Sequence, residues 1–96
     1  DCNPYLGIAA TLACGYLGLM EKKAPRPEFS GSAYIDSDDI PVNLGDALDL
    51  LEEDVALCEV MGPEFIAVYD SVKRNEYKEF LQVISPWERE HLLTNV

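Results

Sequence analysis

The stretch NPYLGIAATLACGYLGLM, residues 3–20, decides the fold of this chain, because it predicts a helix that is apolar on nearly every side. Asn3 can cap such a helix with its side chain, and the proline that follows suits the first helical position. A helix without a polar face is typical of the interior of a larger body. The chain opens directly into this helix, so we expect a fragment or a cleaved chain.

Small and large residues of this predicted helix lie on different sides. The small residues form one stripe that another backbone can approach closely, and large apolar residues cover the other sides. The small residues are Gly7, Thr11, Cys14, Gly15 and Gly18, and the large ones are Tyr5, Leu6, Ile8, Leu12, Tyr16, Leu17, Leu19 and Met20. The remaining 76 residues hold only two or three amphipathic helices, so we expect part of this helix to stay uncovered.

Negative charge is concentrated in the middle of the chain. Residues 36–64 carry ten acids and no base, which accounts for all but one unit of the net charge of −11. The acids alternate with leucines at helical spacing, which indicates that they form the solvated face of helices. The stretch contains no base with which these acids could pair. Because an acidic surface repels phosphate backbones and anionic lipid, we expect neither nucleic acid nor a membrane as a partner.

The cysteines and the apolar run bear on the compartment. Cys2, Cys14 and Cys58 are odd in number and form no CxxC pair, which argues against a disulfide framework and a structural zinc site. Free thiols fit a reducing cytosol, so we expect a cytoplasmic protein. The apolar run at residues 5–20 is short for a membrane span and has no basic flank before it.

Turn and capping residues divide the chain into one mainly α-helical domain, residues 1–96. We expect a buried helix within residues 1–23, an extended crossover over residues 24–42 with its two PxP prolines, helices within residues 43–84, and a terminal helix in residues 85–96. Residues 33–35 can form a short strand or an anchor.

Capping residues subdivide the helical part further. Asn43 and Asp54 are each expected to cap a helix. Gly62 and Pro63 are expected to end the helix that Asp54 caps and to begin the next one. The longest of these runs from about Pro63 to Val83, with an apolar seam and a local ion pair between Asp70 and Arg74. The seam residues are Ile66, Tyr69, Tyr77, Phe80 and Ile84.

The terminal segment carries the clearest local signal. Ser85, Pro86 and Glu88 combine an N-cap, a proline at the first helical position and a capping-box glutamate. His91 lies four residues after Trp87, so both share one helix face and a packing role is expected for the imidazole. The apolar residues Trp87, Leu92 and Leu93 are unusual in a free tail. We therefore predict that this tail docks on another surface.

No complete catalytic or metal site can be assembled from these residues. The acids at 36–39 resemble a calcium loop, but an EF-hand needs glycine and glutamate where this chain has Pro41 and Ala47. The GYLG sequence at 15–18 lacks the strand and the lysine of a phosphate loop. No cysteine is placed by the sequence beside His91. We assign no catalytic, cofactor-binding or metal-ligating residue.

The opening residues resemble a family signature. DCNPYL at residues 1–6 and AATLACGYLG at residues 9–18 resemble the D-x-NPYL and AA-x-LA-x-G-x-x-G segments of glutamine synthetase. Later features occur in the same order, including GSAY at residues 31–34 and the closing Trp87-Glu88, so the resemblance covers essentially the whole chain. The closing pattern is more similar to the bacterial branch, which includes the gamma-glutamyl-polyamine ligases.

This resemblance implies the helical carboxy-terminal part of an α+β catalytic domain. Family members use ATP to form a γ-glutamyl phosphate that ammonia or an amine attacks, with Mg or Mn ions held by glutamates. Those catalytic and metal positions correspond to residues before Asp1, so none is carried over to this chain. The place of the family's adenylylated tyrosine holds residues 36–39, DSDD, which does not match that regulation.

The resemblance also implies the partners. The first helix would back the catalytic sheet of the same polypeptide, and the terminal helix would join subunits of a double-ring homo-oligomer, a dodecamer. Two alternatives stay open: an independent acidic helical interaction module, and a catalytically inactive structural oligomer of the family. An R-x-E-x-R strand before Asp1 would indicate the active ligase, and damaged metal-ligand positions would indicate the inactive oligomer.

Overall fold

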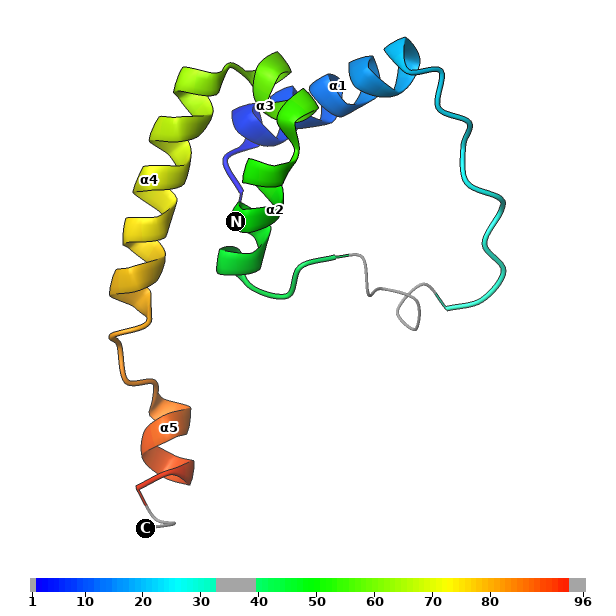
Figure 1. Cartoon of the computed structure of the whole chain (residues 1–96). Helices are drawn as coiled ribbons and strands as arrows, with labels where there is room; N and C mark the ends of the chain where they lie inside the picture. Colours follow the sequence, from blue (N-terminus) through cyan, green and yellow to red (C-terminus); the bar gives the residue numbers. More distant parts are fainter. Residues whose placement is uncertain (1, 33–39, 94–96) are drawn as a thin grey trace.

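The computed structural model describes residues 2–32 and 40–93 of the chain. Of these residues 68% are helical and none lies in a strand, which confirms the mainly α prediction. The helices are α1 (Pro4–Met20), α2 (Leu44–Glu53), α3 (Val55–Met61), α4 (Pro63–Phe80) and α5 (Pro86–His91) (Figure 1). The possible strand or anchor at residues 33–35 and the acidic turn at 36–39 lie outside the described residues.

Side-chain caps begin most of these helices where the sequence predicted. The Asn3 carboxamide oxygen accepts hydrogen bonds from the backbone N–H groups of Tyr5 at 3.0 Å and Leu6 at 3.4 Å. Asn43 and Asp54 cap α2 and α3 in the same way. Each oxygen satisfies an N–H group that the first turn of a helix leaves without a backbone partner.

Helix α4 starts as predicted but ends earlier. Gly62 takes a positive φ of 98°, which favours glycine, and Pro63 then occupies the first helical position. The sequence placed the end near Val83, whereas α4 ends at Phe80. After that residue the chain tightens, because the Gln82 and Val83 N–H groups donate to carbonyls three residues back instead of four.

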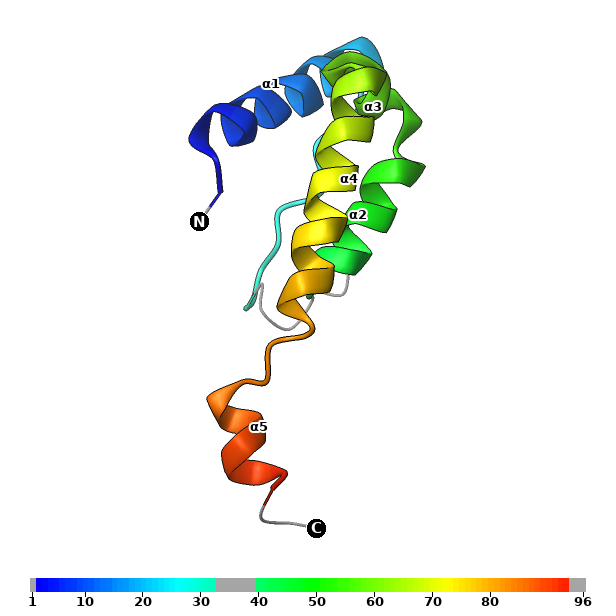
Figure 2. The same ribbon diagram turned by 90° about the vertical axis from the view of Figure 1, so that its left-hand side faces the viewer.

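Helix α3 lies at the centre of the packing. It contacts α1, α2 and α4, and α2 also packs against α4 (Figures 1 and 2). Gly45 permits the close approach of α2 to α4, because a Cβ added there would lie 3.1 Å from Cε1 of Tyr77. Among the described residues the buried apolar core consists of Ala13, Leu48 and Ile66 alone.

The molecule is far more open than a compact domain of its length. Its radius of gyration is 17.8 Å, whereas a compact chain of this length has about 12–13 Å. Its accessible surface is 8608 Å², compared with about 5,500 Å² for a folded monomer of the same mass. Helix α5 extends away from the other helices and packs against none of them in the part of the chain that is described. The helices therefore expose surface that a self-contained domain would bury.

Candidate functional site

Helix α1 presents three different faces, and only one of them is covered. The covered face points towards α3 and holds Leu6, Ala10, Ala13 and Leu17, which are buried or half-buried. These four residues recur at spacings of four, three and four, so they lie on one side of a helix. The nearby helices thus shelter one side of α1 and leave the rest of its circumference open.

The second face of α1 carries five large apolar side chains, and all five are exposed. The exposed fractions are 83% for Tyr5, 62% for Ile8, 68% for Leu12, 53% for Tyr16 and 80% for Leu19. At 100° per residue these five positions fall within an arc of about 80°. We call them the large-residue face. It contains no charged side chain, so water has no ionised group to solvate along it.

The third face is the stripe of small residues. A Cβ added at Gly15 or Gly18 would meet no heavy atom within 4 Å, and one at Gly7 would lie 3.3 Å from the Cys2 sulfur. Within the described residues no other backbone approaches Gly15 or Gly18. The sequence suggested that another backbone packs closely against this stripe. That packing therefore stays a prediction, and it would involve a surface other than the described residues.

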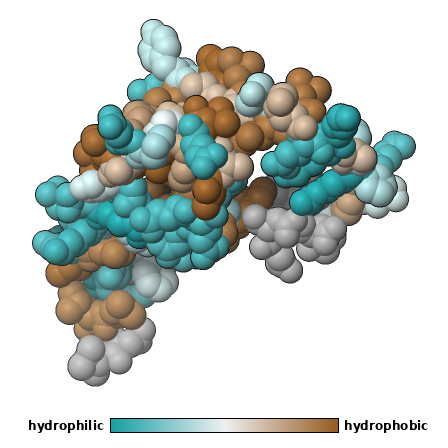
Figure 3. Space-filling model, turned by 45° about the horizontal axis from the view of Figure 1, so that its top comes forward, coloured by the Kyte–Doolittle hydropathy of each residue, from teal (hydrophilic) through white to brown (hydrophobic). Residues whose placement is uncertain are grey.

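Apolar hollows lie on both sides of the α1–α3 contact. One, of about 650 Å³, is bordered by all four of the first helices and includes Ala10, Leu51 and Tyr69 in its lining. The other, of about 520 Å³, is wide open and includes Leu12, Tyr16 and Val60. Figure 3 shows hydrophobic residues on the upper part of the molecule, where α1 and α3 lie, and a band of hydrophilic residues across the middle of the left side, with hydrophobic residues again below it. The larger hollow lies against the covered face of α1 at Leu6 and Ala10, whereas the smaller one reaches the exposed residues Leu12 and Tyr16.

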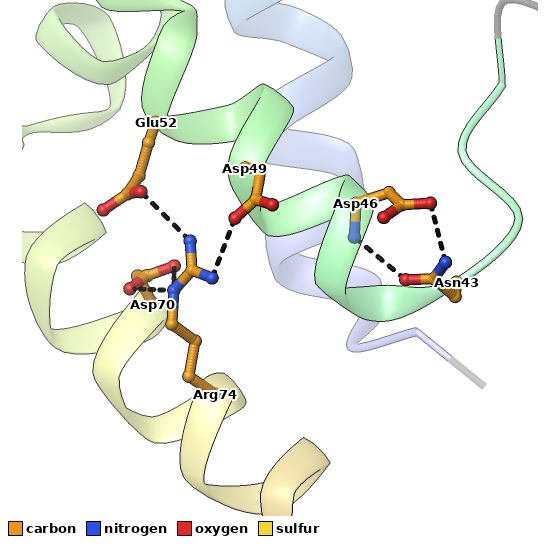
Figure 4. A network of polar contacts seen from close by, with 6 residues as sticks. All are labelled: Asn43, Asp46, Asp49, Glu52, Asp70 and Arg74. Carbon is orange, nitrogen blue, oxygen red and sulfur yellow. Dashed lines mark hydrogen bonds and ion pairs between the residues drawn. The ribbon is translucent and has the colours of Figure 1, made fainter.

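Arg74 forms the main polar link between helices. Its Nε donates to the Asp70 carboxylate on the same helix at 2.9 Å, as the sequence predicted. Its Nη1 reaches Asp49 at 2.9 Å and its Nη2 reaches Glu52 at 3.0 Å, both on α2 (Figure 4). The acidic stretch holds no base of its own, and α4 brings Arg74 to it from outside the stretch. In the sequence, the one indication that Asp49 and Glu52 bind the same cation is their spacing of three residues, which puts them on one face of α2.

These hydrogen bonds keep the guanidinium charged. The pKa of Arg74 is raised above its ordinary value, first by the hydrogen bond to Asp70 and next by the one to Asp49, while partial desolvation opposes the shift. The side chain is 39% exposed, so solvent screens the ion pairs and they contribute modestly to stability. Their geometric effect is that one planar group bonds to carboxylates on both α2 and α4.

Replacing Arg74 with methionine should loosen α2. The aliphatic stem is largely retained, but Asp49, Glu52 and Asp70 then face one another without a cation. We expect amide hydrogen exchange in α2 to become several-fold faster in low salt, with a smaller change in 1 M salt because salt screens the repulsion. Lys73→Met is the matched control, since Lys73 pairs with Glu76 on its own helix. Equal effects of the two substitutions would contradict a specific role for Arg74.

Helix α5 confirms the predicted capping box and the predicted packing of His91 against Trp87. The Ser85 hydroxyl oxygen accepts from the Glu88 N–H at 3.1 Å, and the Glu88 carboxylate accepts from the Ser85 N–H at 2.6 Å. The rings of Trp87 and His91 stack with centroids 4.6 Å apart and an interplanar angle of 13°. The indole is 61% exposed even so. Helix α5 is thus organised by its own residues and still offers an apolar surface.

The capping box should respond to acid. The backbone hydrogen bond from Ser85 is the largest cause that holds the pKa of Glu88 below its ordinary value of 4.5. A lowered folded-state pKa stabilises α5 above the unfolded value, and the stabilisation is lost as the pH falls through the folded value. We therefore expect the helical circular dichroism of a peptide of residues 81–96 to fall on acidification below about pH 4.5.

Variants of the same peptide test this cause. Ser85→Ala should reduce helicity at pH 7, since losing an N-cap costs about 0.5–2 kcal/mol. Glu88→Gln should remove most of the acid response because it cannot ionise. An acid response of full size in Glu88→Gln would show that another group is responsible.

Among the described residues, those that could carry chemistry do not form a reactive cluster. Cys2 and Cys14 are exposed free thiols near or on α1, and the Cys58 thiol on α3 donates to the Leu51 carbonyl at 3.1 Å. His91 lies on α5, which packs against neither α1 nor α3. Over residues 2–32 and 40–93, no three His, Cys, Asp or Glu side chains are placed to hold a metal ion. No helix in these ranges has the length and apolarity needed to span a bilayer.

Comparison with known proteins shows the family of this chain. Residues 1–92 match the family model described as glutamine synthetase, catalytic domain. The chain is 31% identical over 102 residues to glutamine synthetase of Halobacterium salinarum, covering 97% of this chain and 22% of that protein. It is 33% identical over 96 residues to glutamine synthetase of Methanocaldococcus jannaschii, covering 91% of this chain and 21% of that protein.

A human relative aligns with a shorter part of the chain. Lengsin of Homo sapiens is 39% identical over 77 residues, which cover 77% of this chain and 15% of that protein. The chain spans about a fifth of the length of the glutamine synthetases it matches, in their carboxy-terminal part. Because the family model covers nearly the whole chain, this chain belongs to the glutamine synthetase family, as a helical portion of its catalytic domain.

Proposed function

We propose that this chain is the carboxy-terminal scaffold of an ATP-dependent ligase that joins glutamate to ammonia or to another amine. The observation that carries the proposal is the large-residue face of α1, which is exposed here in a chain that matches a catalytic domain over residues 1–92. In the proposal this face packs against the rest of the same catalytic domain. The contribution of the chain is then to support the reaction centre from behind.

The amount of exposed surface supports a permanent neighbour. The accessible surface exceeds that of a compact monomer by about 3,000 Å², from 8608 Å² observed and about 5,500 Å² expected. A standard protein interface buries about 800 Å² on each partner. The excess is several times larger, and exposed large apolar side chains occur on α1, α4 and α5. Such an area suits a domain interior and subunit contacts better than one transient partner.

Two exposed faces on one helix indicate two neighbours. The small-residue stripe offers close backbone approach at Gly15 and Gly18, whereas the large-residue face needs pockets that accept Leu12 and the rings of Tyr5 and Tyr16. Buried tyrosine hydroxyls usually find hydrogen-bond partners. The surface proposed to cover the large-residue face is therefore apolar at its centre and polar where the two rings end.

The nucleotide and the metal ions belong to other parts of the proposed enzyme. ATP and Mg or Mn are the cofactors that the family resemblance implies. The residues described here do not supply a fitting donor set, since no group of three metal-ligating side chains converges among them. We therefore derive no reaction step through these groups in this chain. A cytoplasmic location is part of the same proposal, and free thiols at Cys2, Cys14 and Cys58 agree with it.

Assay of the complete protein tests the ligase. With glutamate, ATP and a divalent ion, we expect ADP and phosphate to form only when ammonia or an accepted amine is also present. A panel of amines would identify the acceptor. Assembly without nucleotide turnover would instead support the inactive structural oligomer. A stable monomer made of these 96 residues alone would support the independent interaction module.

The terminal helix is proposed to join subunits of a double-ring homo-oligomer. Trp87, Leu92 and Leu93 are 61%, 54% and 74% exposed on and just after α5. Truncating a tryptophan that becomes buried costs about 3–5 kcal/mol. We therefore expect Trp87→Ala to shift the complete protein to smaller assemblies in sedimentation velocity, while Trp87→Phe retains most of the mass. An unchanged sedimentation profile for Trp87→Ala would remove α5 from the subunit contacts.

A further inference from the structure

We draw no further inference here: the strongest candidate, the exposed apolar arm formed by residues 81–93 with Trp87, Leu92 and Leu93, carries nothing beyond the proposed subunit contact because nothing in the structure shows what covers it.

Discussion

Leu12→Asp is expected to abolish activity and assembly of the complete protein while making the isolated 96-residue chain more soluble. Leu12 is 68% exposed in this chain and lies at the centre of the large-residue face. If the rest of the catalytic domain covers that face, an aspartate there places a carboxylate in an apolar interface. Leaving a buried charge without a partner costs about 3–5 kcal/mol, a large share of a stability of about 5–15 kcal/mol.

The experiment is specific because the substitution is expected to harm the complete protein and to improve the solubility of the isolated chain. In the isolated chain the same aspartate stays in water, where it only interrupts an exposed apolar stripe. Leu12→Met is the matched control, because a hydrophobic replacement of similar volume usually costs less than about 1.5 kcal/mol. We would measure amine-dependent ATP turnover and sedimentation for the complete protein, and the soluble fraction for the isolated chain. Full activity in Leu12→Asp would mean that the large-residue face meets solvent.

The isolated 96-residue chain should associate with itself or fold incompletely. Its described core holds three buried apolar side chains, and its radius of gyration of 17.8 Å is well above that of a compact domain. Apolar patches larger than a few hundred square ångströms are rare on soluble monomers. We expect strong binding of a hydrophobic dye and a broad thermal transition. Sedimentation should show species well above the chain mass of 10.7 kDa.

Supplying the missing surface should reverse this behaviour. Co-expression with the preceding part of the catalytic domain is expected to recruit the chain into a stable complex and to suppress dye binding. The Leu12→Asp chain is the matched control, since it should be soluble but fail to join that complex. A monomer of 10.7 kDa that melts cooperatively would contradict the prediction and favour an independent module.

Features that depend on near neighbours in sequence were predictable from the residues alone. Asn3, Asn43, Asp54 and Ser85 all accept the capping hydrogen bonds expected of them. Each cap joins atoms two or three residues apart, so a short window of sequence contains both partners. The family signature was readable for a related reason, since it combines the cap, the proline and the small-residue stripe in one continuous segment that begins with DCNPYL.

Contacts between distant segments could not be foreseen in the same way. Arg74 lies 25 residues from Asp49 and 22 from Glu52, and only the packing of α4 against α2 brings them together. The end of α4 at Phe80 was also missed, because the apolar pattern continues to Ile84 while the backbone tightens after Phe80. Hydrophobic spacing reports which side of a helix is apolar and does not report where its last hydrogen bond forms.

By itself, the sequence determined that the chain is mainly helical, where most helices begin, and that α1 carries more apolar surface than residues 2–32 and 40–93 cover. Only the tertiary structure decided which face of α1 turns towards α3 and which faces stay open. It also decided that Arg74 is the cation that pairs with the acids of α2. The physical reason is the range of the interactions. Caps and helical periodicity act within about four residues. By contrast, the choice of covered face depends on how separate helices share one small core.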